Sequence, residues 1–84
     1  MSEKIIKLVE NIISAFNGKL PETNIIDARD LLYHDEWGEA LSIICDQLYE
    51  YDIGVCEEDY RMIEAAGMKM GLDSEMWKRL TVTE

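Results

Sequence analysis

The hydrophobic positions of this chain recur every three or four residues, which is the spacing of amphipathic helices. The first such series comprises Ile5, Leu8, Val9, Ile12 and Phe16. It predicts a helix over residues 3–17, because side chains at this spacing share one helix face and Gly18 then supplies a helix stop. No segment shows the alternation of apolar and polar residues that is typical of a β-strand.

The rest of the chain divides into further helices of the same kind. We expect them at about residues 24–33, 36–51 and 57–70, with Asp35 as the N-cap of the helix over residues 36–51. A short final helix begins after Asp73 or Ser74. Residues 52–55 are too few for anything except a turn between adjacent helices. Gly67, inside the fourth helix, costs roughly 1 kcal/mol relative to alanine, which indicates close approach of another helix. The predicted fold is a single domain over residues 1–84, an all-α bundle of four to five helices.

The predicted third helix has two different faces. Its apolar side carries Trp37, Leu41, Ile44 and Leu48. Five carboxylates gather on a second arc of the helical wheel, here called the acidic arc: Asp35, Glu36, Glu39, Asp46 and Glu50. Ile43 falls inside this arc, and Tyr49 lies away from the apolar side. An acidic surface that also holds an isoleucine and a tyrosine predicts a face that a partner covers.

The charge of the chain is concentrated around this helix. Residues 30–64 hold eleven carboxylates and one basic residue, Arg61, so they account for the whole net charge of −10. A solvated helix face is the ordinary explanation of such a charge run. Like charges on one face repel by a few tenths of a kcal/mol per pair, however, so their localisation favours a binding surface. The candidate binding residues are Asp35, Glu36, Glu39, Ile43, Asp46, Tyr49, Glu50, Asp52, Glu57 and Glu58.

Composition limits the partners. A surface of charge −10 repels nucleic acid and anionic membranes, so we expect neither, and a basic protein is the natural complement. No apolar run approaches the ~20 residues of a membrane span. The N-terminal residues lack the pattern of a signal peptide, which predicts a cytoplasmic location. Cys45 and Cys56 are accordingly expected to be reduced thiols.

The sequence carries no motif for catalysis or for a metal site. A cysteine nucleophile would have to meet His34, the only histidine, and no known spacing supports that pairing. The acidic residues lack the spacing of a calcium loop. Asp73-Ser74 is similar to the prosthetic-group site of acyl carrier proteins, but only ten residues follow Ser74. We therefore expect no enzymatic activity, no cofactor and no metal.

Two short runs carry a resemblance to a known family. They are Glu36-Trp37-Gly38-Glu39-Ala40-Leu41 and Cys45-Asp46-Gln47-Leu48-Tyr49-Glu50, continued by Glu57-Glu58-Asp59-Tyr60, Met70-Gly71-Leu72 and Trp77. Across residues 27–80 the chain resembles the Maf-type (MafI) immunity proteins of bacteria. The resemblance implies a cytoplasmic protein that binds and neutralises the C-terminal domain of a secreted or surface-displayed toxin, often a nuclease. Toxins of contact-dependent growth inhibition systems belong to this class.

The distribution of acidic residues agrees with the role of a toxin-binding protein. The choice of candidate binding residues rests on this distribution alone. A nuclease active site holds phosphates with lysine and arginine, which a carboxylate face can cover. Ile43 and Tyr49 would then be the anchors that slow dissociation. The alternative is an acidic adaptor domain that binds another basic protein, and a third option is a carrier protein that uses Ser74. The toxin's chemistry and the oligomeric state stay open at this level.

Overall fold

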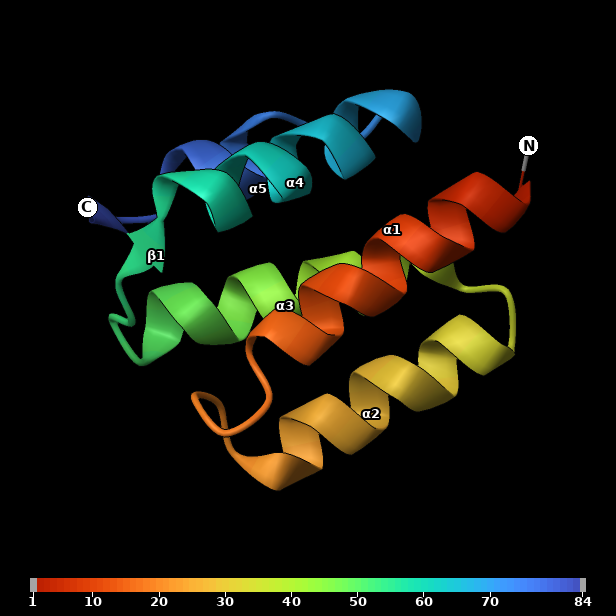
Figure 1. The fold of residues 1–84 in the computed structure, drawn as a ribbon, viewed down its shortest axis with the longest axis horizontal. Coiled ribbons are helices and arrows are strands. Elements are labelled where there is room, and N and C mark those ends of the chain that lie inside the picture. The colour runs from red at the N-terminus through yellow and green to blue at the C-terminus, as the bar shows by residue number, and fades with distance from the viewer. Residues whose placement is uncertain (1, 84) are drawn as a thin grey trace.

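The computed structural model describes residues 2–83, and these residues form a helical bundle with one very short parallel sheet (Figure 1). The helices are α1 (Ser2–Ala15), α2 (Glu22–Tyr33), α3 (Trp37–Glu50), α4 (Glu57–Lys69) and α5 (Glu75–Lys78). The strands are β1 (Val55–Cys56) and β2 (Val82–Thr83). The predicted all-α class is confirmed, and each predicted helix appears within three residues of its expected start.

The two strands were not predicted. Val55 pairs with Val82 and Cys56 with Thr83, in parallel register. A strand of two residues is too short to show an alternating pattern, and its partner lies far away in the sequence. The pairing ties the C-terminal end of the chain to the segment between α3 and α4.

The helices form three layers, in which α1 and α3 lie between α2 on one side and α4 with α5 on the other (Figure 1). Each outer layer touches both central helices, since α2 contacts α1 and α3, α4 contacts α1 and α3, and α5 contacts α3. The side chains of the core come from every helix, and the largest buried ones include Trp77, Phe16, Ile12, Ile13, Leu41, Ile44 and Leu48. Three of these lie on the predicted apolar side of α3, so that side faces inward as expected.

Gly67 lies where α4 meets α5. A Cβ atom at this position would overlap the ring of Trp77, whose side chain is only 2% exposed. The close helix approach that the mid-helix glycine predicted is therefore present. Trp77 is the residue that fills the space, and it seals the core from the C-terminal side.

Candidate protein-binding surface

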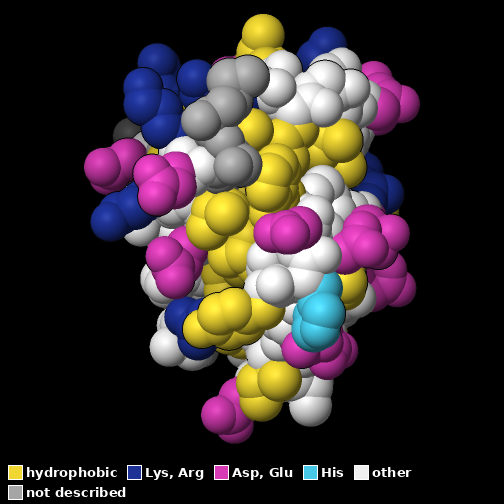
Figure 2. Space-filling model, turned by 90° about the vertical axis from the view of Figure 1, so that its right-hand side faces the viewer, with side chains coloured by type: hydrophobic (Ala, Val, Ile, Leu, Met, Phe, Trp, Pro, Cys, Tyr) yellow, Lys and Arg dark blue, Asp and Glu magenta, His cyan; other side chains and the backbone are white. Residues whose placement is uncertain are grey.

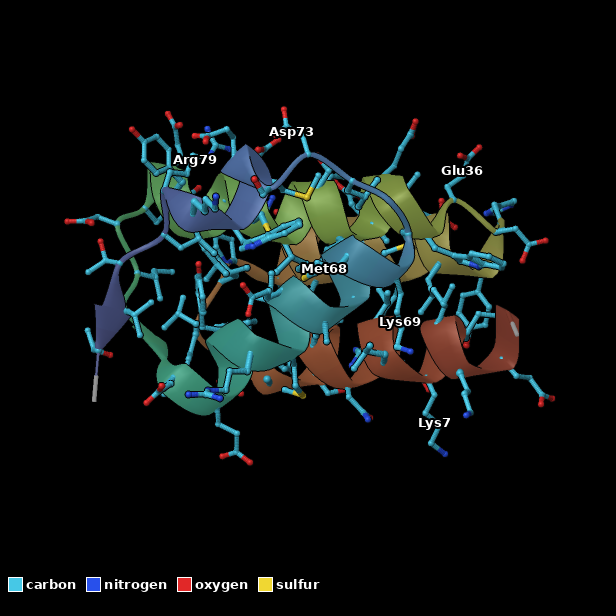
Figure 3. All side chains as sticks on the ribbon, turned by 90° about the horizontal axis from the view of Figure 1, so that it is seen from above. Lys7, Glu36, Met68, Lys69, Asp73 and Arg79 are labelled. Carbon is cyan, nitrogen blue, oxygen red and sulfur yellow. The ribbon has the colours of Figure 1, made fainter. Side chains whose placement is uncertain are left out.

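The carboxylates of the acidic arc lie on the solvent side of the bundle. Glu39, Asp46 and Glu50 are all exposed, whereas Leu41 and Ile44 on the other side of α3 are fully buried. The helical period separates the two sets, because residues four or seven apart return to the same face. Figure 3 shows Glu36 at the upper edge of the molecule and Lys7 at the lower edge. The charge asymmetry expected from the sequence is thus a property of the folded surface.

The two predicted anchors differ in exposure. Tyr49 is 51% exposed, as expected for a residue away from the apolar side of α3. Ile43 is half-buried, so only part of its side chain can reach a partner. Tyr49 therefore offers the larger apolar contact of the two.

Arg79 adds a basic side chain to the exposed face of α3 that holds the acidic arc (Figure 3). Its Nη2 atom donates to Asp46 Oδ1, and its guanidinium carbon lies 4.5 Å from the centre of the Tyr49 ring. A cation stacked on an aromatic ring and paired with a carboxylate is favourable in both contacts. Asp46 is consequently partly neutralised, and one face of Tyr49 is covered. Sequence reasoning missed this residue because α5 and α3 are brought together only by the fold.

Asp35 and Asp52 occupy the left-handed backbone region, with φ values of 61° and 54°. Each follows a helix and closes it by the same hydrogen-bond pattern. The Asp35 N–H donates to Leu32 O at 3.2 Å and the next N–H, that of Glu36, donates to Leu31 O at 2.9 Å. This is the Schellman motif, whose left-handed position usually holds glycine.

Asp52 repeats that arrangement at the end of α3. Its N–H donates to Tyr49 O at 3.1 Å, and the Ile53 N–H donates to Leu48 O at 2.9 Å. The expectation that Asp35 would be the N-cap of the third helix is wrong. Glu36 is the N-cap of α3, without a side-chain hydrogen bond, because Asp35 is still engaged in ending α2.

Both aspartates follow the C-terminus of a helix, and Asp35 also directly precedes the N-terminus of α3, where the helix dipole favours negative charge. The C-terminus of a helix carries a partial negative charge, so a carboxylate there is unfavourable by about 0.3–1 kcal/mol. Neither α2 nor α3 has a basic residue in its last turn to offset this. The left-handed conformation adds a further cost that glycine would avoid. At both positions a neutral glycine would avoid the left-handed strain and the repulsion from the preceding helix end.

Glu57 and Glu58 have an ordinary structural explanation. They lie in the first turn of α4, where the helix dipole favours negative charge. Glu57 also accepts a hydrogen bond of 2.7 Å from Arg61, and this bond raises the pKa of Arg61. Two of the ten candidate residues therefore stabilise α4, and they belong to a different layer from the acidic arc.

A hollow of about 400 Å³ opens beside the start of α3. We call it the end groove; its walls are Ile5, Trp37, Gly38, Met70 and Leu72, and its rim is Asp35, Glu36 and Glu39. Figure 2 views this end of the bundle and shows a stripe of hydrophobic side chains flanked by acidic ones. The acidic arc is therefore continuous with an apolar hollow.

A second hollow of about 220 Å³ adjoins the end groove at Asp35, which lines both. Its lining includes Ile6, Leu32 and Tyr33. Tyr33 is 85% exposed, more than any other large hydrophobic residue among those described. Its position directly before His34-Asp35-Glu36 was the sequence signal that could have identified it as a contact residue.

The two cysteines and the histidine each have a different environment in the fold. Cys45 is fully buried, and burial raises the pKa of its thiol to about 12, so the thiol stays protonated at neutral pH. Cys56 Sγ accepts the Asp59 N–H at 3.4 Å and caps α4. His34 is exposed, and the Asp30 carbonyl that its Nδ1 contacts at 2.8 Å raises its pKa. Within residues 2–83 no group of three or more acidic, cysteine or histidine side chains is placed to hold a metal ion.

Among the described helices, none combines the length and the apolar character needed to cross a bilayer.

Comparisons of the chain with protein-family models, with curated proteins and with solved structures find no match.

Proposed function

We propose that the protein is an immunity protein that binds and neutralises the basic C-terminal domain of a bacterial toxin. The resemblance of residues 27–80 to Maf-type immunity proteins suggests this class. The acidic arc, the end groove and the exposed tyrosines supply a surface with the matching chemistry. A nuclease domain fits this surface best, since lysine and arginine line the sites that bind phosphate.

One observation carries the proposal: carboxylates occupy positions that are unfavourable for folding. Asp35 and Asp52 each combine a left-handed backbone with the negative end of a helix. Sites that violate local folding rules are expected where a functional constraint outweighs stability. A requirement for negative charge at the two ends of α3 explains why aspartate and not glycine stands at both positions.

The proposed mode of action is electrostatic capture followed by apolar docking. Carboxylates on the rim steer a basic domain and raise its association rate, toward ~10⁸ M⁻¹s⁻¹ at low salt. Tyr49 and Tyr33 then present aromatic surface of the kind that dominates interface energetics. Bound in this way, the protein covers the phosphate-binding site of the toxin and excludes its substrate.

The proposal is tested with the gene immediately upstream of the gene for this chain. We expect that gene to encode an exported protein with a basic C-terminal domain that arrests bacterial growth when produced alone. Production of this chain in the same cells should restore growth, and the two purified proteins should bind each other in calorimetry. A toxic domain that is neither bound nor neutralised would refute the proposal.

Replacement of Asp35 or Asp52 by glycine is expected to have opposite effects on stability and on binding. Each change relieves the left-handed strain and the helix-end repulsion, so the free energy of unfolding should rise by up to about 1 kcal/mol. Each also removes a carboxylate from the binding surface, so affinity for the toxin domain should fall severalfold. Urea denaturation and calorimetry measure the two quantities. Unchanged affinity in both variants would show that these aspartates do not contribute to binding.

A further inference from the structure

We infer that the end groove binds an apolar side chain carried on a cationic segment of the partner protein. This inference rests on the proposed function and deepens it, because it names the place and the chemistry of the anchor contact. The sequence predicted the anchors at Ile43, in the middle of α3, and at Tyr49, in its last turn. The structure moves the main apolar contact to the start of that helix.

Three parts of the fold build the groove. Ile5 comes from α1, Trp37 from α3, and Met70 with Leu72 from the connection between α4 and α5. A Schellman motif holds Leu72 in place, since its N–H donates to Gly67 O at 2.9 Å around Gly71, whose φ is 70°. The walls are thus fixed by packed helices and by a defined turn rather than by a long loop.

Gly38 lies in the wall of the groove, in the first turn of α3. A Cβ atom there would meet Leu72 Cδ2 at 3.5 Å, an ordinary contact, so a side chain is sterically possible and Leu72 packs against α3 at this point. Leu72 and Trp37 therefore supply the apolar surface of this wall.

Charge complementarity identifies the occupant. Asp35, Glu36 and Glu39 surround the opening, and no lysine or arginine is among the described residues that line it. An apolar side chain can pack against the apolar walls, and a lysine or arginine beside it can pair with the acidic rim. A second copy of this chain does not, because it would bring the same acidic rim and a further net charge of −10 against the first.

The first test needs no toxin and uses phenethylammonium, which combines an aromatic ring with a cation. Trp37 and Trp77 are the two tryptophans of the chain, so their indole N–H signals serve as reporters in ¹⁵N-resolved NMR spectra. We expect phenethylammonium to shift the Trp37 signal, while ethylammonium at equal concentration does not. Trp77, buried in the core, should stay unchanged and acts as the internal reference. Equal shifts with both cations, or no shift with either, would overturn the inference.

The second test uses the toxin domain and a groove-filling variant, Gly38→Leu. Leucine is a good helix former, and a helical side chain points back toward the N-terminus, over the groove. We expect affinity to fall about tenfold, mainly through faster dissociation, as for loss of an interface anchor. The matched control is Ala65→Leu, which adds leucine at an exposed position of α4 and should leave affinity unchanged.

The outcomes separate the inference from the proposed function. If the unmodified chain binds the toxin domain and Gly38→Leu binds equally well, the groove inference is wrong and the proposed function stands. If the unmodified chain does not bind at all, the proposed function fails. The phenethylammonium titration then still decides whether the groove accepts an apolar cation. Circular dichroism of both leucine variants verifies that the helices remain intact.

Discussion

Replacement of Glu39 and Glu50 by lysine is expected to weaken binding of the toxin domain by about 100-fold or more at low ionic strength. Both carboxylates are exposed on α3, and neither has an ion pair among the residues that the structure describes. Asp46 lies between them on the helix surface but is already paired with Arg79. Glu39 and Glu50 are therefore the carboxylates of α3 that are most available to form ion pairs with a basic partner.

The association rate, measured at several salt concentrations, is the decisive quantity in this experiment. The double variant should lose most of its affinity through slower association, and the difference should shrink as salt screens the charges. The matched control is Glu22→Lys with Asp27→Lys, which makes the same change of charge at two exposed carboxylates of α2 that line neither hollow. Equal losses in the two double variants would show that net charge, and not this face, determines binding.

Replacement of Gly67 by alanine is expected to destabilise the protein by about 1–3 kcal/mol, although helix propensity alone predicts a gain of roughly 1 kcal/mol. The added methyl group would overlap the Trp77 ring, which is enclosed in the core and cannot move aside without disturbing it. Against a total stability of about 5–15 kcal/mol, such a loss is large for a domain of this size.

Gly38→Ala is the matched control, since it changes a second helical glycine at which the new methyl group meets Leu72 at an ordinary distance. Urea denaturation should show a stability gain for Gly38→Ala and a loss for Gly67→Ala. A smaller residue at position 77 should relieve the overlap, so Gly67→Ala should cost less in a Trp77→Leu background. Equal stability changes at both glycines would show that the α4–α5 contact is looser than described.

The acidic arc shows that a helical pattern predicts which residues of one helix are exposed, but not which other side chains pack against them. The sequence places Glu39, Asp46 and Glu50 opposite Leu41 and Ile44, and the structure has them exposed and buried as predicted. Such a prediction works because it depends only on the geometry of one helix. Whether the exposed face stays free of other side chains depends on the packing of α5 against α3, which no local pattern contains.

The end groove could not be predicted from the sequence for the same reason. Its walls come from α1, α3 and the connection after α4, so its residues are scattered through the sequence. Read singly, Ile5 and Trp37 are ordinary apolar positions of two helices. Only the fold places them next to one another, beside Gly38 and Leu72, as the lining of one hollow.

By itself, the sequence determined the number and order of the helices, the inward side of α3 and the concentration of charge around it. These follow from the helical period and from composition, which act within a few neighbouring residues. The tertiary structure alone decided that Arg79 covers Tyr49, that Asp35 and Asp52 close helices in a left-handed conformation, and that an apolar groove opens beside the acidic arc. Those features arise where packed helices bring together residues that are distant in the chain, or where a turn must adapt to that packing.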